Sequence, residues 1–140
     1  MELAILLRNA LRAAGRTDLN VVPAVAVRIS TAFRTGIIPD IAVVNVDCNH
    51  SGFAPQDPVL AVEVWSPGNT REERDTKIAG CAAARVPYLW VVELPEDKPG
   101  RFWGYRLGES GYRQEVYVAA GETVVTLGPV PITVDTADLR

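Results

Sequence analysis

Hydrophobic positions along the chain follow two periods, one typical of helices and one typical of strands. Over residues 2–14, apolar side chains recur every three or four residues, which predicts an amphipathic helix. Gly15 follows, and glycine commonly ends helices because it accepts a left-handed backbone. The Val-rich segment 20–29 and the segment 37–45 predict two strands. The first contains Pro23, which sheets tolerate best at an edge.

The middle of the chain predicts a strand, a helix and another strand in succession. Residues 59–65 are apolar and β-branched, which predicts a strand. Asn69 or Thr70 can then cap a helix over residues 71–85. Residues 86–94 are apolar enough for a central strand. The remainder alternates and is interrupted by glycine turns, which predicts a hairpin and a terminal β-element. This order predicts an α/β (α+β) fold, a mixed β-sheet flanked by helices.

Composition limits the classes of protein that remain possible. The chain has 140 residues, of which 48% are hydrophobic, and we predict one domain over residues 1–140. No segment approaches the ~18 consecutive apolar residues of a membrane helix, so we predict a cytoplasmic protein without membrane contact. Cys48 and Cys81 lie far apart and suggest neither a zinc site nor a disulfide scaffold. A net charge of −3 argues against coating nucleic acid through bulk charge, but leaves room for a local basic face.

Glu63 is a single carboxylate in the apolar run "VLAVEVW". Burial of an ionised carboxylate without a partner costs several kcal/mol, so Glu63 must be paired, protonated, metal-bound or turned toward a cleft. A simpler interpretation places Glu63 on the solvent face of a half-buried strand, because it alternates with valines. Its same-face neighbours Ala61 and Trp65 are apolar, which argues against a fully solvated face.

Asp40 precedes Glu63 by 23 positions, at the start of the preceding predicted strand. If the two strands are neighbours, both carboxylates meet at one edge of the sheet and suit Mg²⁺ or Mn²⁺, which would activate a water near a phosphate. Lys77, two turns into the following helix, could stabilise the developing charge. Otherwise Asp40 serves a turn, and Lys77 forms a surface ion pair with Glu73.

Three segments together resemble a known family: "PD" at 39–40, "EVWSPGNTREERDTK" at 63–77 and "VPYLWVVEL" at 86–94. The chain resembles the putative restriction endonuclease family of the PD-(D/E)XK nuclease superfamily over roughly residues 2–140. The resemblance implies a restriction-endonuclease-like core and phosphodiester hydrolysis with Asp40 and Glu63 as metal ligands. It also implies DNA as the nucleic-acid substrate. Because so small a domain has little surface for sequence readout, we also expect a homodimer.

The chain departs from the superfamily pattern at several positions. Trp65 stands where the pattern has lysine, two residues after the glutamate, and the resemblance implies that Lys77 replaces that lysine. Arg85 and Tyr88 replace the Gly and Glu of the GVPEYW-like motif. An upstream acid of the superfamily would correspond to Glu2. These departures leave an alternative open, a catalytically inactive nuclease fold used for binding or assembly.

The remaining candidates have simple structural explanations. Arg71, Arg74 and Arg85 lie close together on a helical wheel and could follow a phosphate backbone, although such a strip is more often a solvated face. His50, the one histidine, lies in the long loop 46–58 and is interpreted as a turn residue. The other aromatic candidates are interpreted as core or interface residues rather than a base-stacking platform: Trp65, Trp90, Trp103, Tyr88 and Tyr105.

Overall fold

The computed structural model describes most of the chain, with gaps between the described segments. These segments are residues 2–23, 29–30, 36–37, 40–45, 58–66, 68–94, 100–119, 121–126 and 128–136. The predicted loop 46–58, with Cys48 and His50, falls almost wholly outside them. Neither helix in the described segments is long and apolar enough to cross a membrane.

Six strands form a central sheet in the order β1, β4, β5, β6, β7, β8. Their bounds are β1 Asn20–Pro23, β4 Ile41–Val44, β5 Pro58–Trp65, β6 Tyr88–Glu93, β7 Arg101–Gly108 and β8 Gly111–Val118. Strands β5 and β6 are parallel, and the other neighbouring pairs are antiparallel. The parallel pair is joined by helix α2 (Arg71–Ala83), as a crossover connection requires. The predicted mixed sheet is therefore confirmed.

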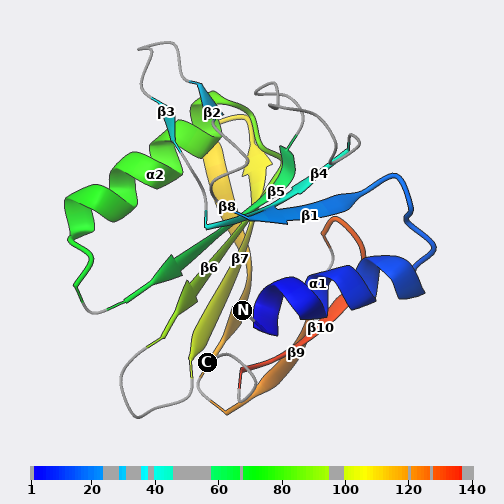
Figure 1. The fold of residues 1–140 in the computed structure, drawn as a ribbon. Helices are drawn as coiled ribbons and strands as arrows, with labels where there is room; N and C mark the ends of the chain where they lie inside the picture. Colours follow the sequence, from blue (N-terminus) through cyan, green and yellow to red (C-terminus); the bar gives the residue numbers. More distant parts are fainter. Residues whose placement is uncertain are drawn as a thin grey trace.

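The two helices lie on opposite faces of this sheet (Figure 1). Helix α1 (Glu2–Ala13) inserts Leu3, Leu7 and Leu11 into an apolar core, as its sequence period predicts. That core also contains the sheet residues Val21, Ile41, Val43, Leu60, Val62, Trp90, Val92 and Phe102. Helix α2 covers a second cluster on the other face, which contains Val22, Ala42, Val44, Ala61, Leu89 and Val91.

Two small sheets accompany the central one. Strands β9 (Thr123–Thr126) and β10 (Ile132–Asp135) pair antiparallel, as do β2 (Ile29–Ser30) and β3 (Gly36–Ile37). The prediction of one strand over residues 20–29 is wrong, because Ile29 belongs to β2 and pairs with β3 while β1 ends at Pro23. The strand predicted over residues 37–45 is likewise too long, because Ile37 belongs to β3 and β4 begins at Ile41. Pro23 lies in an edge strand, as expected of a residue that cannot donate a backbone hydrogen bond.

The helix ends follow local chemistry. Gly15 has a φ of 72°, which ends α1 in a left-handed conformation. The Thr70 hydroxyl accepts a hydrogen bond from the Glu73 N–H at 3.1 Å and so caps α2. Helix α2 ends at Ala83, two residues before the predicted end at Arg85. Arg85 itself has a φ of 59°, a left-handed conformation that cannot continue a right-handed helix.

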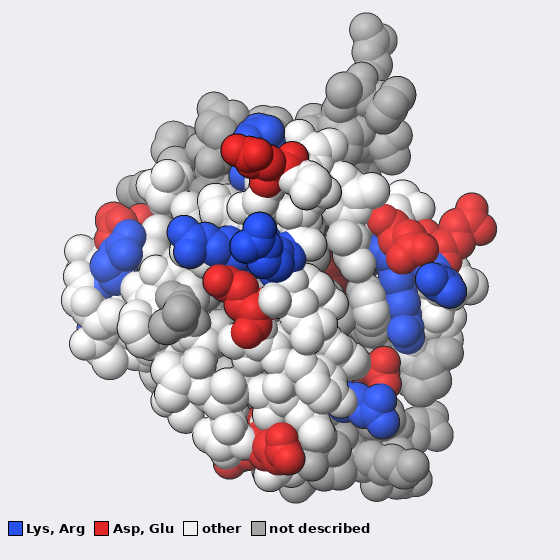
Figure 2. All heavy atoms as spheres, turned by 180° about the vertical axis from the view of Figure 1, so that it is seen from behind, with Lys and Arg blue, Asp and Glu red and all other residues white. Residues whose placement is uncertain are grey.

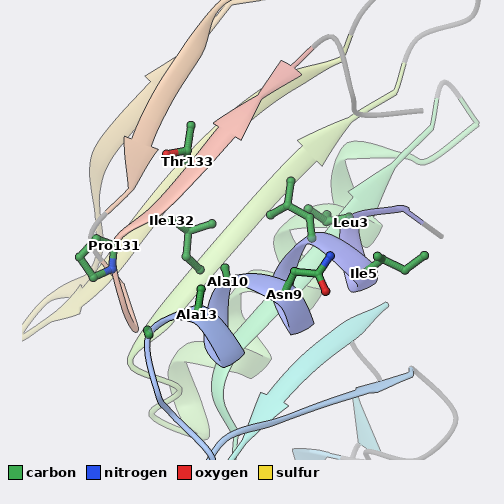
Figure 3. A pocket seen from close by; sticks show the side chains of 10 residues that line it. Leu3, Ile5, Asn9, Ala10, Ala13, Pro131, Ile132 and Thr133 are labelled. Carbon is green, nitrogen blue, oxygen red and sulfur yellow. The ribbon is translucent and has the colours of Figure 1, made fainter.

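Gly128, between β9 and β10, packs closely against Tyr88, the first residue of β6. A Cβ atom at Gly128 would overlap the aromatic ring of Tyr88, so no other residue fits there without a shift of that ring. On the same side of the molecule, a groove of about 890 Å³ lies between α1 and β10. Figure 3 shows its lining, which includes Ile5, Ala10 and Ile132 and no titratable side chain. Among the described residues, this groove therefore lacks the groups that phosphodiester chemistry needs.

Candidate active site

Pairing of β4 with β5 brings the two candidate carboxylates together. Ile41 pairs with Val62 in antiparallel register, so Asp40, one residue earlier, lies opposite Glu63. The Asp40 Oδ2 atom accepts a hydrogen bond from the backbone N–H of Val64 at 2.7 Å. This bond ties the start of β4 to the strand that carries Glu63. The expectation that these strands are neighbours is thus confirmed, and the interpretation of Asp40 as only a turn residue does not account for this contact.

Glu63 is fully buried, with 0% of its surface exposed, on the α2 face of the sheet. The interpretation of Glu63 as a residue on a solvated face is therefore wrong. Neither of its carboxylate oxygens accepts a hydrogen bond from the described residues. Burial raises the pKa of Glu63 from the ordinary 4.5 to about 7, the charge of Lys77 opposes this rise, and the Asp40 carboxylate adds to it. Near neutral pH, the carboxyl group is therefore easily shifted between its neutral and charged forms.

Lys77 extends from α2 to this carboxylate. Its Nζ atom lies 3.2 Å from Glu63 Oε2, at an angle that does not fit a hydrogen bond, and 38% of the lysine side chain remains exposed. Burial lowers the pKa of Lys77, but the Glu63 and Asp40 carboxylates outweigh that effect and raise it. Lys77 therefore stays charged beside the acids. Its contact is with Glu63, rather than the surface pair with Glu73 that its helical spacing suggests.

Cys81 follows Lys77 by one helical turn and is also fully buried. Burial raises the pKa of this thiol to about 12, and the nearby Glu63 charge adds to the rise. A protonated buried thiol is neither a nucleophile nor a good metal ligand at neutral pH. Cys81 thus packs against the site as a small apolar group, as expected of a thiol in a helix core.

Trp65, which stands at the lysine position of the superfamily pattern, packs against the guanidinium of Arg74. The guanidinium of Arg74 lies 4.5 Å from the centre of the Trp65 ring, within cation–π distance. Arg74 also donates to the Ser66 carbonyl at 3.4 Å and lies 3.8 Å from Glu93. These contacts fasten the start of α2 to the ends of β5 and β6. Arg74 is therefore engaged within the protein and is poorly placed to follow a phosphate backbone.

The other candidates lie apart from the carboxylates or outside the described side chains. Arg71 is 95% exposed and lies 3.8 Å from Asp75. Arg85 lies beyond the end of α2, so the basic strip predicted from the helical wheel is wrong at that position. Glu2 begins α1, but its side chain is not among those described, and its proposed role stays a prediction. His50 and Pro39 lie outside the described segments, and the interpretation of His50 as a turn residue also stays a prediction.

Charge on the surface is mixed rather than uniformly basic. Figure 2 shows acidic and basic side chains interspersed over the face of the molecule opposite to the view in Figure 1. This distribution agrees with the net charge of −3. The described residues of this face form no broad basic patch, so any affinity for nucleic acid that they provide must come from a local site.

The donor set fits a hard divalent cation. Both Glu63 oxygens are buried next to a second carboxylate; Oε2 is paired with Lys77, and Oε1 has no hydrogen-bond partner among the described residues, so a cation would stabilise it. Within the described segments, no cluster of three or more His, Cys, Asp or Glu side chains is suited to a metal. Two protein carboxylates are nevertheless the number that Mg²⁺ commonly takes, with waters and phosphate oxygens as its other ligands.

A mixed sheet with a helix on each face, and an acidic pair on the neighbouring strands β4 and β5, defines an α+β protein with a candidate metal site. A crystal structure of a putative nuclease belonging to DUF820, from Anabaena variabilis, has the same fold, with a TM-score of 0.69 and 17% sequence identity. The alignment covers 99% of this chain and 75% of that chain. The family model described as "Putative restriction endonuclease" (Uma2) matches residues 1–135, and the chain belongs to this family. No curated protein matches it significantly.

Proposed function

We propose that the protein is a metal-dependent nuclease that hydrolyses phosphodiester bonds, with DNA as its substrate. Family membership supports a nuclease, and the observation that carries the finer proposal is the environment of Glu63. A fully buried carboxylate faces a second carboxylate and forms an ion pair with a lysine through Oε2, while Oε1 has no hydrogen-bond partner among the described residues. Such an arrangement destabilises the protein unless a ligand uses it.

In this proposal Asp40 and Glu63 hold Mg²⁺ or Mn²⁺. When bound, the cation supplies water activation and neutralises charge on the phosphate. The hydrogen bond from the Val64 N–H fixes one oxygen of Asp40 and so orients its carboxylate beside Glu63. Burial of Glu63 excludes bulk water and strengthens electrostatic interactions at its oxygens.

Lys77 has two tasks in this proposal. In the absence of substrate, its ammonium balances the Glu63 charge at 3.2 Å. Its side chain is partly exposed, so the same Nζ atom can turn to a phosphate oxygen and stabilise the negative charge that develops there. Lysine suits this use because its ammonium is a compact charge on a flexible stem.

The test is plasmid nicking in Mg²⁺, in Mn²⁺ and in EDTA by wild type and three variants: Asp40→Asn, Glu63→Gln and Lys77→Met. The first two keep the shape of the side chain while removing its charge, and we expect cleavage to fall to background. Lys77→Met should lower the rate by roughly 10²–10³-fold. Glu72→Gln is the matched control because Glu72 is exposed on the same helix, and it should cut like wild type.

A second readout separates metal binding from cleavage. Mn²⁺ at a hundredfold excess over its dissociation constant should stabilise wild type by about 2.7 kcal/mol, and Glu63→Gln by much less. Equal cleavage by wild type and the two carboxylate variants would exclude this site as the active centre. Metal binding without any cleavage of DNA or RNA would favour the alternative, an inactive nuclease fold used for binding or assembly. The prediction of a homodimer is tested separately by light scattering.

A further inference from the structure

A row of paired residues runs across the sheet from the carboxylates to its far edge. Glu63 of β5 pairs with Val91 of β6, Val91 with Trp103 of β7, and Trp103 with Tyr117 of β8. Directly paired residues project from the same face of a sheet, here the face that α2 covers in part. Neighbouring strands lie about 4.8 Å apart, which places Trp103 about 10 Å and Tyr117 about 14 Å from Glu63 along the row.

The last two members of this row form an aromatic pair at the rim of the sheet. The Trp103 and Tyr117 rings have centroids 5.3 Å apart and planes inclined by 42°. Trp103 is half-buried against the α2-face cluster, while Tyr117 is 46% exposed on the edge strand β8. About half of Tyr117 remains in water, so this part of its surface adds nothing to burial on folding and is open to a ligand.

The surroundings of the pair favour a flat, uncharged ligand group. Residues 113–115 of the same strand are the exposed polar residues Arg113, Gln114 and Glu115, whose charges cancel. The pair therefore presents a partly exposed aromatic ring to a ligand, rather than a cluster of positive charges. Aromatic side chains beside a nuclease site stack on unpaired bases, and they do so for every base because each has a π-face. A second protein copy could also cover this edge, and its binding would change the oligomeric state.

We propose that Trp103 and Tyr117 form a stacking subsite for one unpaired nucleobase of the strand whose phosphate lies at Asp40 and Glu63. This proposal rests on the proposed nuclease function, since it places the base on the same sheet face as the carboxylates. Stacking supplies affinity that the net charge of −3 does not. The substrate class is then nucleic acid with a single-stranded or opened segment near the cut, recognised without preference for one base.

The first test measures binding separately from cleavage. Fluorescence anisotropy of a labelled single-stranded oligonucleotide, in Ca²⁺ and in EDTA, compares wild type with Tyr117→Ser and Tyr117→Phe. We expect Tyr117→Ser to bind roughly 5- to 150-fold more weakly and Tyr117→Phe to bind like wild type. Ile5→Ser is the matched control, because Ile5 is similarly exposed, at 54%, but lies on α1 at the opposite face. It should leave binding unchanged.

The second test locates the base. A single abasic position is moved along the oligonucleotide, and wild type should lose affinity when it reaches one particular position. Tyr117→Ser should lose no further affinity at that position, because the abasic site and the substitution remove the same stacking contact. Unchanged binding by Tyr117→Ser, in a wild type that binds and cuts, overturns the subsite alone. Failure of wild type to bind any nucleic acid overturns the nuclease function as well. A change of mass in light scattering with binding intact assigns Tyr117 to a contact between copies and overturns the subsite.

Discussion

The two faces of the central sheet differ in what their buried side chains contribute. The α1 face buries a continuous apolar cluster that includes Trp90 and Phe102. The α2 face buries smaller residues such as Ala42 and Ala61, and among them the fully buried Glu63. One face therefore provides most of the apolar burial that stabilises the fold, while the other gives up some of that burial to hold a carboxylate. Proteins often accept lower stability at the place where they act.

Truncation on the α1 face should give the largest loss of stability. Trp90 is 1% exposed and contacts Phe102 edge to face at 5.1 Å. We expect Trp90→Ala to lower the free energy of unfolding by about 3–5 kcal/mol, because a large side chain leaves a cavity. Its neighbour Val91 projects to the α2 face, and Val91→Ala should lower it by only about 2 kcal/mol. Urea unfolding followed by circular dichroism measures both, and equal losses would contradict the difference between the faces.

Substitution of the buried acid on the α2 face should raise, rather than lower, the free energy of unfolding at high pH. The pKa of Glu63 is raised to about 7 in the folded protein from an ordinary 4.5, so folding favours the neutral form. That contribution is complete below about pH 4.5 and is lost as the pH rises through 7, on the order of 3 kcal/mol in total. In EDTA, Glu63→Gln should therefore be more stable than wild type at pH 8.5 and close to it at pH 4.5.

Unfolding curves at several pH values measure this prediction, with Glu72→Gln as the exposed control. The difference between wild type and Glu63→Gln should grow between about pH 4.5 and 7 and level off above that. A difference that stays constant with pH would mean that Glu63 keeps an ordinary pKa. In that case the α2 face would carry no electrostatic penalty, and the comparison between the faces would depend on packing alone.

The smallest expected effect lies just beyond α2. Arg85 has a φ of 59°, and the motif that this segment resembles has glycine there, which adopts such a conformation without strain. We expect Arg85→Gly to raise the free energy of unfolding by about 0.5–1 kcal/mol. Ala84, the preceding residue, is right-handed with a φ of −79°, so Ala84→Gly should lower it by a similar amount. Two changes of the same sign in thermal unfolding would refute this explanation of Arg85.

Much of the fold was predictable from sequence because its elements have clear local patterns. The period of the first helix, the apolar run of β5 and the glycine turn of the last hairpin each indicated the correct element. The exceptions were the segments 20–29 and 37–45, each of which divides between the central sheet and the small sheet of β2 and β3. Local propensity gives no information about such a change of partner.

The candidate site was predictable only as residue types. The apolar surroundings of Glu63 and the position of Asp40 suggested an acidic pair, but their proximity depends on the register between β4 and β5. The contact of Lys77 with Glu63 depends on how α2 lies over the sheet. The pairing of Tyr117 with Trp103 gave no sequence signal, because it depends on the register between β7 and β8, and Tyr117 itself stands between two valines in an ordinary strand pattern. These features follow from tertiary contacts rather than from local pattern.

The glycine at position 128 has a consequence for the history of the family. Its space is occupied by the ring of Tyr88, at a position where the resembled motif has glutamate. The two positions are therefore expected to covary: relatives that carry an aromatic residue at 88 should keep glycine at 128, while relatives with a smaller or more flexible residue at 88 are free to acquire a side chain there. The order of changes is therefore constrained: a side chain at 128 fits only after the ring at 88 has been lost.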